Sequence, residues 1–185
     1  MQRITQYPLL KEIQERWSAR AFSTRTVQQD DLYALIEAAS LAPSAMNEQP
    51  WRFILGDKPD DLSILKQSLF PSNHDWAQHA PMLIALCTKK TTTFNGKDNF
   101  YSRFDAGAAW AFLSLEANRR NLIAHAIGGF DKQMIHDHYA IDDDFEVVLM
   151  IAIGYPGDIH TLSEKYQERE KPGIRRSFME SILTK

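Results

Sequence analysis

Two continuous apolar runs constrain the fold of this chain most strongly. Residues 81–87 read Pro-Met-Leu-Ile-Ala-Leu-Cys, and residues 145–153 read Phe-Glu-Val-Val-Leu-Met-Ile-Ala-Ile. Short apolar runs of this kind are typical of strands that are buried on both faces of a sheet. Because buried strands need a helical layer on each side, we expect an α/β or α+β fold with helices covering a central sheet.

Apolar residues at helical spacing predict the helices that cover this sheet. The residues from 106 to 111 are mostly small, so the helix that contains them can pack closely against its neighbours. The ranges expected to be helical are about 8–17, 28–42, 60–69, 102–122 and 131–139.

The boundaries of several elements have recognisable signals. We expect Thr26 and Gln29 to form a capping box, with Ser102 and Asp105 forming a second cap. Pro43 is expected to end the helix before it. Residues 51–55 are expected to form a short strand, and the polar residues 89–100 a flexible loop.

Composition excludes several classes of function. The chain has 185 residues and a net charge of −3, which suits one domain and argues against a strongly basic nucleic-acid-binding protein. No apolar run approaches the roughly 18–20 residues that cross a bilayer, and the first residues lack a secretory signal. We therefore expect a single cytoplasmic domain over residues 1–185, with neither a membrane nor a nucleic acid as partner.

Residues that often carry chemistry lack suitable neighbours in this sequence. The single cysteine, Cys87, excludes an intramolecular disulfide, and its apolar strand favours inert packing over nucleophilic chemistry. His136 and His138 lie two residues apart, so on a helix they point to different faces. No Gly-x-Ser-x-Gly elbow occurs. We expect no metal site and assign no catalytic side chain.

The segment Arg16-Trp17-Ser18-Ala19-Arg20 places two guanidinium groups and a hydroxyl within five residues. Guanidinium groups offer paired donors that match phosphate oxygens. The alternative is a solvated helix end with two surface arginines, which the spacing taken alone favours. A second basic patch, with Arg169, Lys171, Arg175 and Arg176, could complete a phosphate cradle or form a charged tail.

The loop between residues 42 and 51 combines two prolines with small residues and two amides. Asn47 and Gln49 can each donate and accept hydrogen bonds, as the edge of a heterocycle requires. The same amides could equally bond to the loop's own backbone. Gly128-Gly129 would let a ligand approach the main chain, although paired glycines most often form only a turn. No Gly-x-Gly-x-x-Gly occurs, so a nicotinamide donor would have no dedicated Rossmann site.

In their order along the chain, these motifs resemble those of the nitroreductase family of FMN enzymes. The matching segments are Arg16-x-Ser18-x-Arg20-x-Phe22, the loop at 42–51, Asn73 before Trp76, Asp105-x-Gly107, His125-x-Ile127-Gly128-Gly129-Phe130-Asp131, Ile153-Gly154-Tyr155-Pro156 and Arg175-Arg176. One departure lies where the family's central helix ends, because a glycine common there is replaced in Asn121-Leu122-Ile123.

The resemblance implies an α+β fold of the α/β/α sandwich type. It would have a central, mainly antiparallel sheet flanked by helices, and two chains would intertwine as a homodimer with two FMN sites at the interface. Residues 158–185, which are too poor in apolar residues for a domain, would form a C-terminal arm that wraps the partner subunit.

The resemblance also implies which residues bind FMN. The phosphate and ribityl chain would be held by the 16–20 segment and one or both C-terminal arginines. The 43–49 loop would line the flavin from the partner subunit, and Asn73 would bond to its pyrimidine side. The full set of implied cofactor-binding residues is Arg16, Trp17, Ser18, Arg20, Pro43, Ser44, Met46, Asn47, Gln49, Asn73, Ile127, Gly128, Gly129, Arg175 and Arg176.

The implied activity is hydride transfer from NADH or NADPH to a nitroaromatic, quinone or related acceptor by a ping-pong mechanism. The alternatives are a specialised flavin enzyme, such as a reductive dehalogenase or a cyclic-peptide dehydrogenase, a non-catalytic FMN-binding module, and a structural dimer without cofactor. Phe94, Phe100, Tyr101 and Phe104 could stack on an aromatic acceptor or pack hydrophobically, and packing is slightly favoured.

Overall fold

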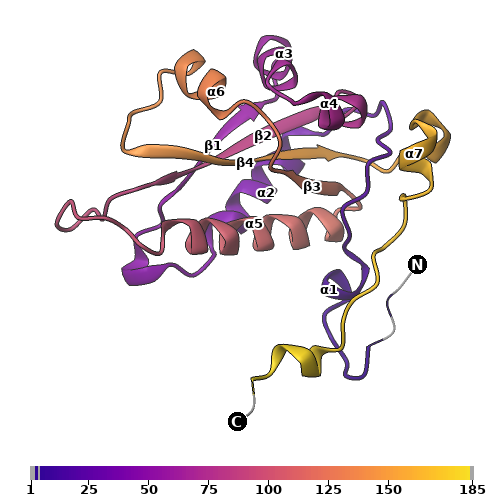
Figure 1. Ribbon diagram of the computed structural model, residues 1–185, viewed down its shortest axis with the longest axis horizontal. Helices are drawn as coiled ribbons and strands as arrows, with labels where there is room; N and C mark the ends of the chain where they lie inside the picture. The colour runs from indigo at the N-terminus through magenta and orange to yellow at the C-terminus, as the bar shows by residue number, and fades with distance from the viewer. Residues whose placement is uncertain (1–2, 4, 184–185) are drawn as a thin grey trace.

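A four-stranded antiparallel sheet lies at the centre of the structure, a computed structural model that describes residue 3 and residues 5–183 (Figure 1). The strands are β1 (Trp51–Gly56), β2 (Met82–Lys89), β3 (Ile123–Ile127) and β4 (Phe145–Gly154), in the order β1-β2-β4-β3. All three strand pairings are antiparallel, which confirms the expected α+β class.

Helices cover both faces of the sheet, as Figure 1 shows. On one face lie α3 (Pro59–Gln67), α4 (Pro71–Ala77) and α6 (Lys132–His138). On the other lie α2 (Gln29–Ser40) and the long α5 (Ser102–Arg119). The remaining elements are α1 (Lys11–Glu15), α7 (Glu164–Gln167) and the short 3₁₀ turns η1 (Ala45–Asn47), η2 (Ile159–Thr161) and η3 (Phe178–Ser181). None of the helices in the described part of the chain is long and apolar enough to cross a membrane.

Successive side chains of β2 point to opposite faces of the sheet, and a helical layer covers each face, which explains why the β2 sequence is apolar throughout. Leu83 and Ala85 pack into the core beneath α3, α4 and α6, whereas Ile84 and Leu86 pack into the core beneath α2 and α5. In β4 the register shifts opposite Leu86, where Val148 is the extra residue of a bulge. Both central strands are therefore sandwiched between two helical layers, as the apolar runs predicted.

Several predicted boundaries are wrong for identifiable reasons. The 8–17 helix shortens to α1, because Leu9 and Leu10 find no core in the single chain and stay 48% and 66% exposed. Neither predicted cap forms. The N-cap of α2 is Gln28 and that of α5 is Tyr101, and neither side chain bonds to its helix.

The long helix also ends earlier than the periodicity predicted, and β3 follows it. Asn121 adopts a left-handed conformation, with φ of 58°, between α5 and β3. Asparagine tolerates this conformation better than most residues, so Asn121 can end the helix in the way that glycine commonly does. The helix α4 was also missed, although Pro71 at its start suits a first helical turn.

The chain ends as an arm that runs beside the N-terminal segment, below α5 in Figure 1. The Tyr7 and Phe178 rings lie edge to face, with their centroids 5.9 Å apart. Both segments leave the sandwich together. The prediction that residues 158–185 wrap a second chain remains a prediction, as does the single domain over residues 1–185.

Candidate functional site

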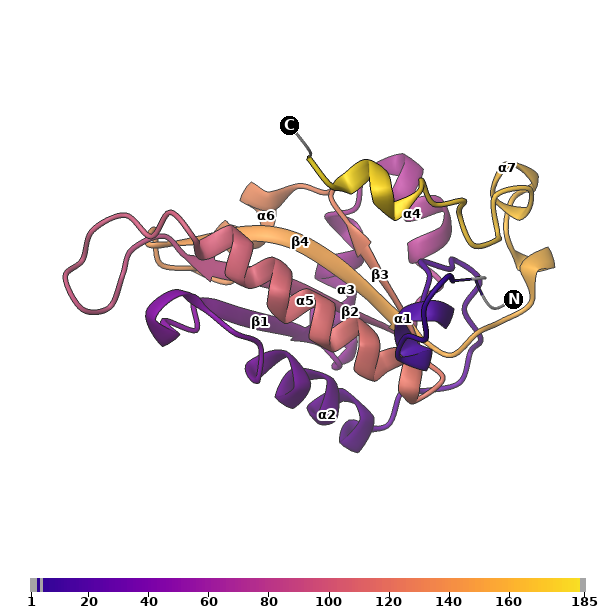
Figure 2. The same cartoon turned by 90° about the horizontal axis from the view of Figure 1, so that it is seen from below.

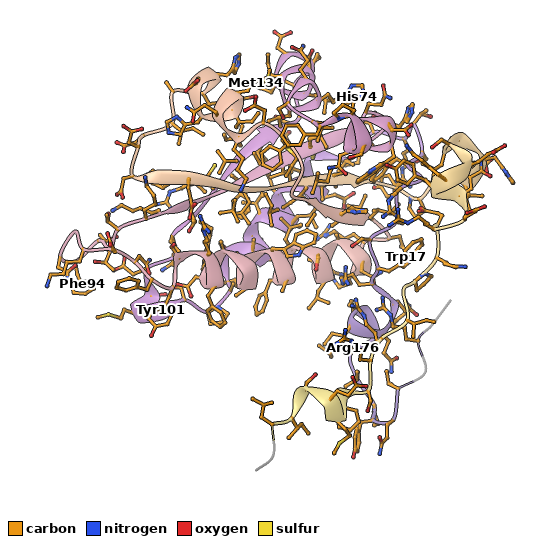
Figure 3. All side chains as sticks on the ribbon, in the orientation of Figure 1. Trp17, His74, Phe94, Tyr101, Met134 and Arg176 are labelled. Atoms are coloured by element: carbon orange, nitrogen blue, oxygen red, sulfur yellow. The ribbon has the colours of Figure 1, made fainter. Side chains whose placement is uncertain are left out.

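The residues expected to form the site gather at two separate places in the chain. Figure 3 shows Phe94 and Tyr101 at one end of the molecule, with Trp17 and Arg176 at the other. The helix α5 joins the two places. Its first turn carries Asp105, which contacts the 43–49 loop, and its last turn carries Asn118, which lines a cavity with Trp17. Thirteen steps of the helix lie between Asp105 and Asn118, which places these two residues about 20 Å apart along its axis.

At the first place, the 43–49 loop is held in an unusual conformation. Met46, Asn47 and Gln49 have φ values of 52°, 59° and 45°, in the left-handed region that residues other than glycine seldom adopt. Such strain persists only where the surroundings enforce it, and it is concentrated at functional sites. The strained backbone therefore marks the 43–49 loop as a candidate part of a functional site, in addition to its connection of α2 to β1.

Three side-chain contacts hold this loop. The buried carboxylate of Asp105 accepts the Ala45 N–H at 3.1 Å, and the Ser44 hydroxyl accepts the Gln49 N–H at 3.0 Å. The Glu48 carboxylate accepts the Thr93 N–H at 2.8 Å and so connects the loop to the hairpin that follows β2. The Met46 side chain is 76% exposed and is free to contact another molecule.

Aromatic side chains surround the same end of the molecule. Phe94, Phe100, Tyr101 and Phe104 are 60%, 90%, 61% and 77% exposed. At these exposures the four rings do not pack into the core of their own chain, and the choice between stacking on an aromatic acceptor and packing against another surface stays open. They form an exposed apolar rim at the end of the molecule where Figure 3 labels Phe94 and Tyr101, and an aromatic ligand or a second chain could cover it.

At the second place, α4 connects the 16–20 segment with the glycine pair. The Asn73 amide donates to the Gly129 carbonyl at 2.9 Å. A Cβ atom on Gly129 would lie 2.5 Å from that amide nitrogen, so any other residue would displace the Asn73 side chain from this hydrogen bond. A Cβ atom on Gly128 would meet nothing within 4 Å. Gly128 therefore presents its backbone to open space at the end of β3, directly after the buried Ile127.

Arg20 is already partnered within the chain. Its guanidinium lies 3.8 Å from the Glu170 carboxylate and over the rings of Trp76 and Tyr166, at 5.7 and 5.5 Å from their centroids. The same carboxylate accepts the backbone N–H groups of Arg20 and Ala21 at 2.6 and 2.9 Å. Glu170 thus anchors the C-terminal arm to the segment that carries the expected phosphate ligands.

His125 supports this segment from beneath. Its Nδ1 atom lies 2.9 Å from the Ala19 carbonyl oxygen, and its ring is 4.4 Å from the Trp76 ring. Burial lowers the pKa of His125 to about 4. The hydrogen bond to the Ala19 carbonyl opposes this shift only in part, and the charges of Arg20 and Arg16 add to it. The imidazole is therefore neutral at pH 7, and its Nδ1–H donates to the carbonyl.

Arg16 has no such acidic partner. It lines a cavity of about 320 Å³ together with Arg3, Arg175 and Leu115 of α5. Burial, and then the charges of Arg3 and Arg175, lower the pKa of Arg16. Among the residues that the structure describes, no carboxylate forms an ion pair with any of these three arginines. The site gathers positive charge without neutralising it, which suits an anionic ligand.

The structure thus distributes the expected site residues unevenly. Arg16 and Arg175 line one cavity. Arg176, which is exposed as Arg175 is, does not line it, but lines the neighbouring cavity between the N-terminal segment and the arm together with Arg3 and Arg175. Trp17 and Ser18 are half-buried within the same segment. The roles of Arg3, Glu170 and the Ala19–His125 contact were missed, because each acts across more than 100 residues or lies outside any motif.

Comparison with known proteins gives consistent matches. The sequence model described as "Nitroreductase family" matches residues 13–70 and 57–155. An uncharacterised 15.4 kDa protein of Mycolicibacterium smegmatis is 30% identical over 71% of this chain and 92% of its own length. A putative NADH dehydrogenase/NAD(P)H nitroreductase of Archaeoglobus fulgidus is 26% identical over 80% of this chain and 86% of its own length.

A solved structure described as "the oxidoreductase containing FMN" superposes with a TM-score of 0.93. It is 33% identical to this chain, and the match covers 98% of this chain and 93% of the other. The sandwich, including the N-terminal segment and most of the arm, is therefore shared with a protein whose description includes FMN.

Proposed function

We propose that this chain, which belongs to the nitroreductase family, is an FMN-dependent oxidoreductase that works as a homodimer. It would take hydride from NADH or NADPH and pass it to a nitroaromatic, quinone or related acceptor by a ping-pong mechanism. The observation that carries the proposal is the unneutralised guanidinium cluster at Arg16 and Arg175, on a chain that matches an FMN-containing oxidoreductase over almost its whole length.

The residues present fit FMN chemically. The cluster at Arg16 offers charge-assisted donors to a phosphate monoester, and Ser18 adds a neutral hydroxyl two residues later. The open backbone at Gly128 and the amide of Asn73 offer polar groups to a heterocycle. When bound, FMN would supply the hydride-accepting and hydride-donating chemistry. The side chains would bind and orient the ligands.

A homodimer would bring the two separated groups of residues together. Within one chain the 43–49 loop lies about 20 Å along α5 from the Arg16 segment. In a twofold dimer the loop of one copy can meet the arginines of the other, because the same pair of surfaces is present on both copies.

The surface of α5 supports this assembly. The helix buries Ala109 and Leu113 against the sheet, yet Phe104 and Phe112 on its outer side are 77% and 40% exposed. Large apolar side chains that gather on the outer side of a helix indicate that another surface covers it. A second copy of this chain would cover this face of α5, which Figure 2 shows along its whole length.

Donor and acceptor would occupy the same place in turn, which explains why the chain needs no Rossmann motif. The exposed aromatic rim at Phe94, Phe100 and Tyr101 would then contact the acceptor.

Steady-state kinetics test the ping-pong proposal directly. We expect double-reciprocal plots of NADH or NADPH oxidation to stay parallel when a nitrobenzene derivative or a benzoquinone is varied as acceptor. Intersecting lines would contradict a shared site. Stable FMN binding without any oxidation of NADH or NADPH would support the non-catalytic binding module instead.

A further inference from the structure

The guanidinium of Arg3 lies where the proposed phosphate ligands meet, although no motif includes it. Its Nη1 atom donates to the Arg16 carbonyl at 2.8 Å, which joins the N-terminal segment to the 16–20 segment. Arg3 also lines the same cavity of about 320 Å³ as Arg16 and Arg175. Three guanidinium groups, two from the first 16 residues and one from the C-terminal arm, therefore share one cavity.

Two features show that Arg3 has unused binding capacity. Its Nε atom is buried and has no hydrogen-bond partner among the described residues. The backbone contact to Arg16 uses one of the five N–H groups of the guanidinium. A buried donor without a partner is costly to leave unpaired, so this atom calls for a partner from outside the chain, such as a water molecule, an ion or a ligand.

The charges of Arg3, Arg16 and Arg175 also favour an anionic ligand between them. Burial and the charge of Arg175 lower the pKa of Arg3, and Arg3 in turn contributes to the lowered pKa of Arg16. The nearby Glu15 pairs with Lys11, at 3.8 Å, rather than with any of the three arginines. The three positive charges repel one another, and a dianion bound between them would reverse the sign of that interaction.

We propose that Arg3 is a third phosphate-binding arginine, which completes with Arg16 and Arg175 a site for the phosphate monoester of FMN. This inference rests on the proposed function. It assigns to the N-terminal segment a direct part in cofactor binding, in addition to any part in dimer contacts. It also favours Arg175 over Arg176, since Arg175 lines a cavity with both Arg3 and Arg16, whereas Arg176 shares a cavity with Arg3 but not with Arg16.

The test compares FMN with riboflavin, which lacks the phosphate, in the full-length protein. We expect Arg3→Gln to weaken FMN binding about tenfold or more and to leave riboflavin binding unchanged, because one charge-assisted contact to the phosphate is lost. Arg3→Lys should weaken FMN binding less than Arg3→Gln, because lysine keeps the positive charge. It should still weaken binding somewhat, because lysine lacks the forked geometry of the guanidinium. Lys11→Gln is the matched control. Lys11 is exposed, and its substitution removes one positive charge from the same end of the molecule.

Three results would overturn the inference. Arg3→Gln could leave FMN affinity unchanged, or it could weaken FMN and riboflavin equally, which would indicate a structural role. It could also weaken only self-association in sedimentation experiments, which would mean that a carboxylate of the second copy is its partner.

A separate measurement distinguishes this inference from the proposed function. Inorganic phosphate, at constant ionic strength, should raise the thermal stability of the flavin-free wild type more than that of Arg3→Gln. If the wild type binds neither FMN nor riboflavin, the proposed function fails, and a phosphate effect that depends on Arg3 would still establish the anion site. If the wild type binds FMN but phosphate stabilises both proteins equally, the role of Arg3 fails alone.

Discussion

The buried carboxylate of Asp105 accepts the backbone N–H of Ala45 at 3.1 Å, across 60 residues of sequence. This contact fixes the first turn of α5 to a loop that contains three residues with positive φ. The strain of such residues costs roughly 1–2 kcal/mol each for ordinary side chains. The loop keeps its shape only because contacts of this kind hold it.

Substitution of Asp105 tests this contact. Burial raises the pKa of Asp105, so the ionised form is the one that the fold penalises. Asp105→Asn keeps an acceptor oxygen without the charge, and we expect it to leave the free energy of unfolding at pH 7 nearly unchanged. Asp105→Ala leaves the Ala45 N–H unpaired and should cost about 1–3 kcal/mol in urea unfolding. Equal losses in the two variants would show that the charge, not the hydrogen bond, matters.

The glycine pair offers a matched comparison. Gly129→Ala places a Cβ atom 2.5 Å from the Asn73 amide nitrogen, so we expect it to break that contact and to lower stability by about 1–3 kcal/mol. Gly128→Ala meets nothing within 4 Å and should change the free energy of unfolding by less than about 0.5 kcal/mol. Urea unfolding of the two flavin-free variants measures the difference. A more destabilising change at Gly128 would contradict the described geometry.

His125 predicts how stability depends on pH. Because its pKa falls to about 4 in the folded protein, from 6.5 when free, the unfolded chain binds the extra proton between these values. Its contribution is fully present above pH 6.5 and is lost as the pH falls toward 4. The loss should reach about 3 kcal/mol.

The measurement is the free energy of unfolding between pH 7.5 and pH 4.5, compared with His125→Asn. The Asn side chain can donate to the Ala19 carbonyl but does not titrate in this range. We expect the variant to show a clearly shallower pH dependence. Identical slopes in the two proteins would assign the pH dependence to other groups.

Complementation between two variants tests the site shared by two chains. Arg16→Gln removes a guanidinium proposed to bind the FMN phosphate, and Asn47→Leu removes a side-chain amide of the 43–49 loop. Each homodimer should lose most of its FMN. A mixed dimer would contain one intact site, with Arg16 from one copy and Asn47 from the other.

Co-expression with two different affinity tags isolates the mixed dimer. We expect it to hold about half the FMN of the wild type. If both residues served the same site from one chain, the mixed dimer would have two half-damaged sites and would bind no more FMN than the variants.

Much of the fold follows from patterns within short stretches of sequence. The apolar runs predicted β2 and β4, because strands buried on both faces have no polar alternation, and the helical spacing predicted α6 within 131–139. β3 was missed because its five residues, Ile-Ala-His-Ala-Ile, continue the apolar pattern of α5, and only the left-handed Asn121 separates the two.

The site was less accessible to sequence reasoning than the fold. Local motifs identify Arg16 and the 43–49 loop as candidate site residues, but the structure separates the two by the length of α5. It also pairs Arg20 with an acidic residue of the arm, Glu170. Contacts such as Arg20–Glu170 and His125–Ala19 bridge 150 and 106 residues. No spacing rule encodes such pairs, because they depend on how the arm and the sheet are packed.

The visible spectrum of the purified protein tests the central claim most directly. We expect a yellow protein with bound FMN, whose flavin absorbance bleaches when NADH or NADPH is added without oxygen and returns when a nitroaromatic or quinone follows. A protein that stays colourless after incubation with FMN would contradict the proposed cofactor site. A yellow protein that neither nicotinamide bleaches would contradict the proposed activity.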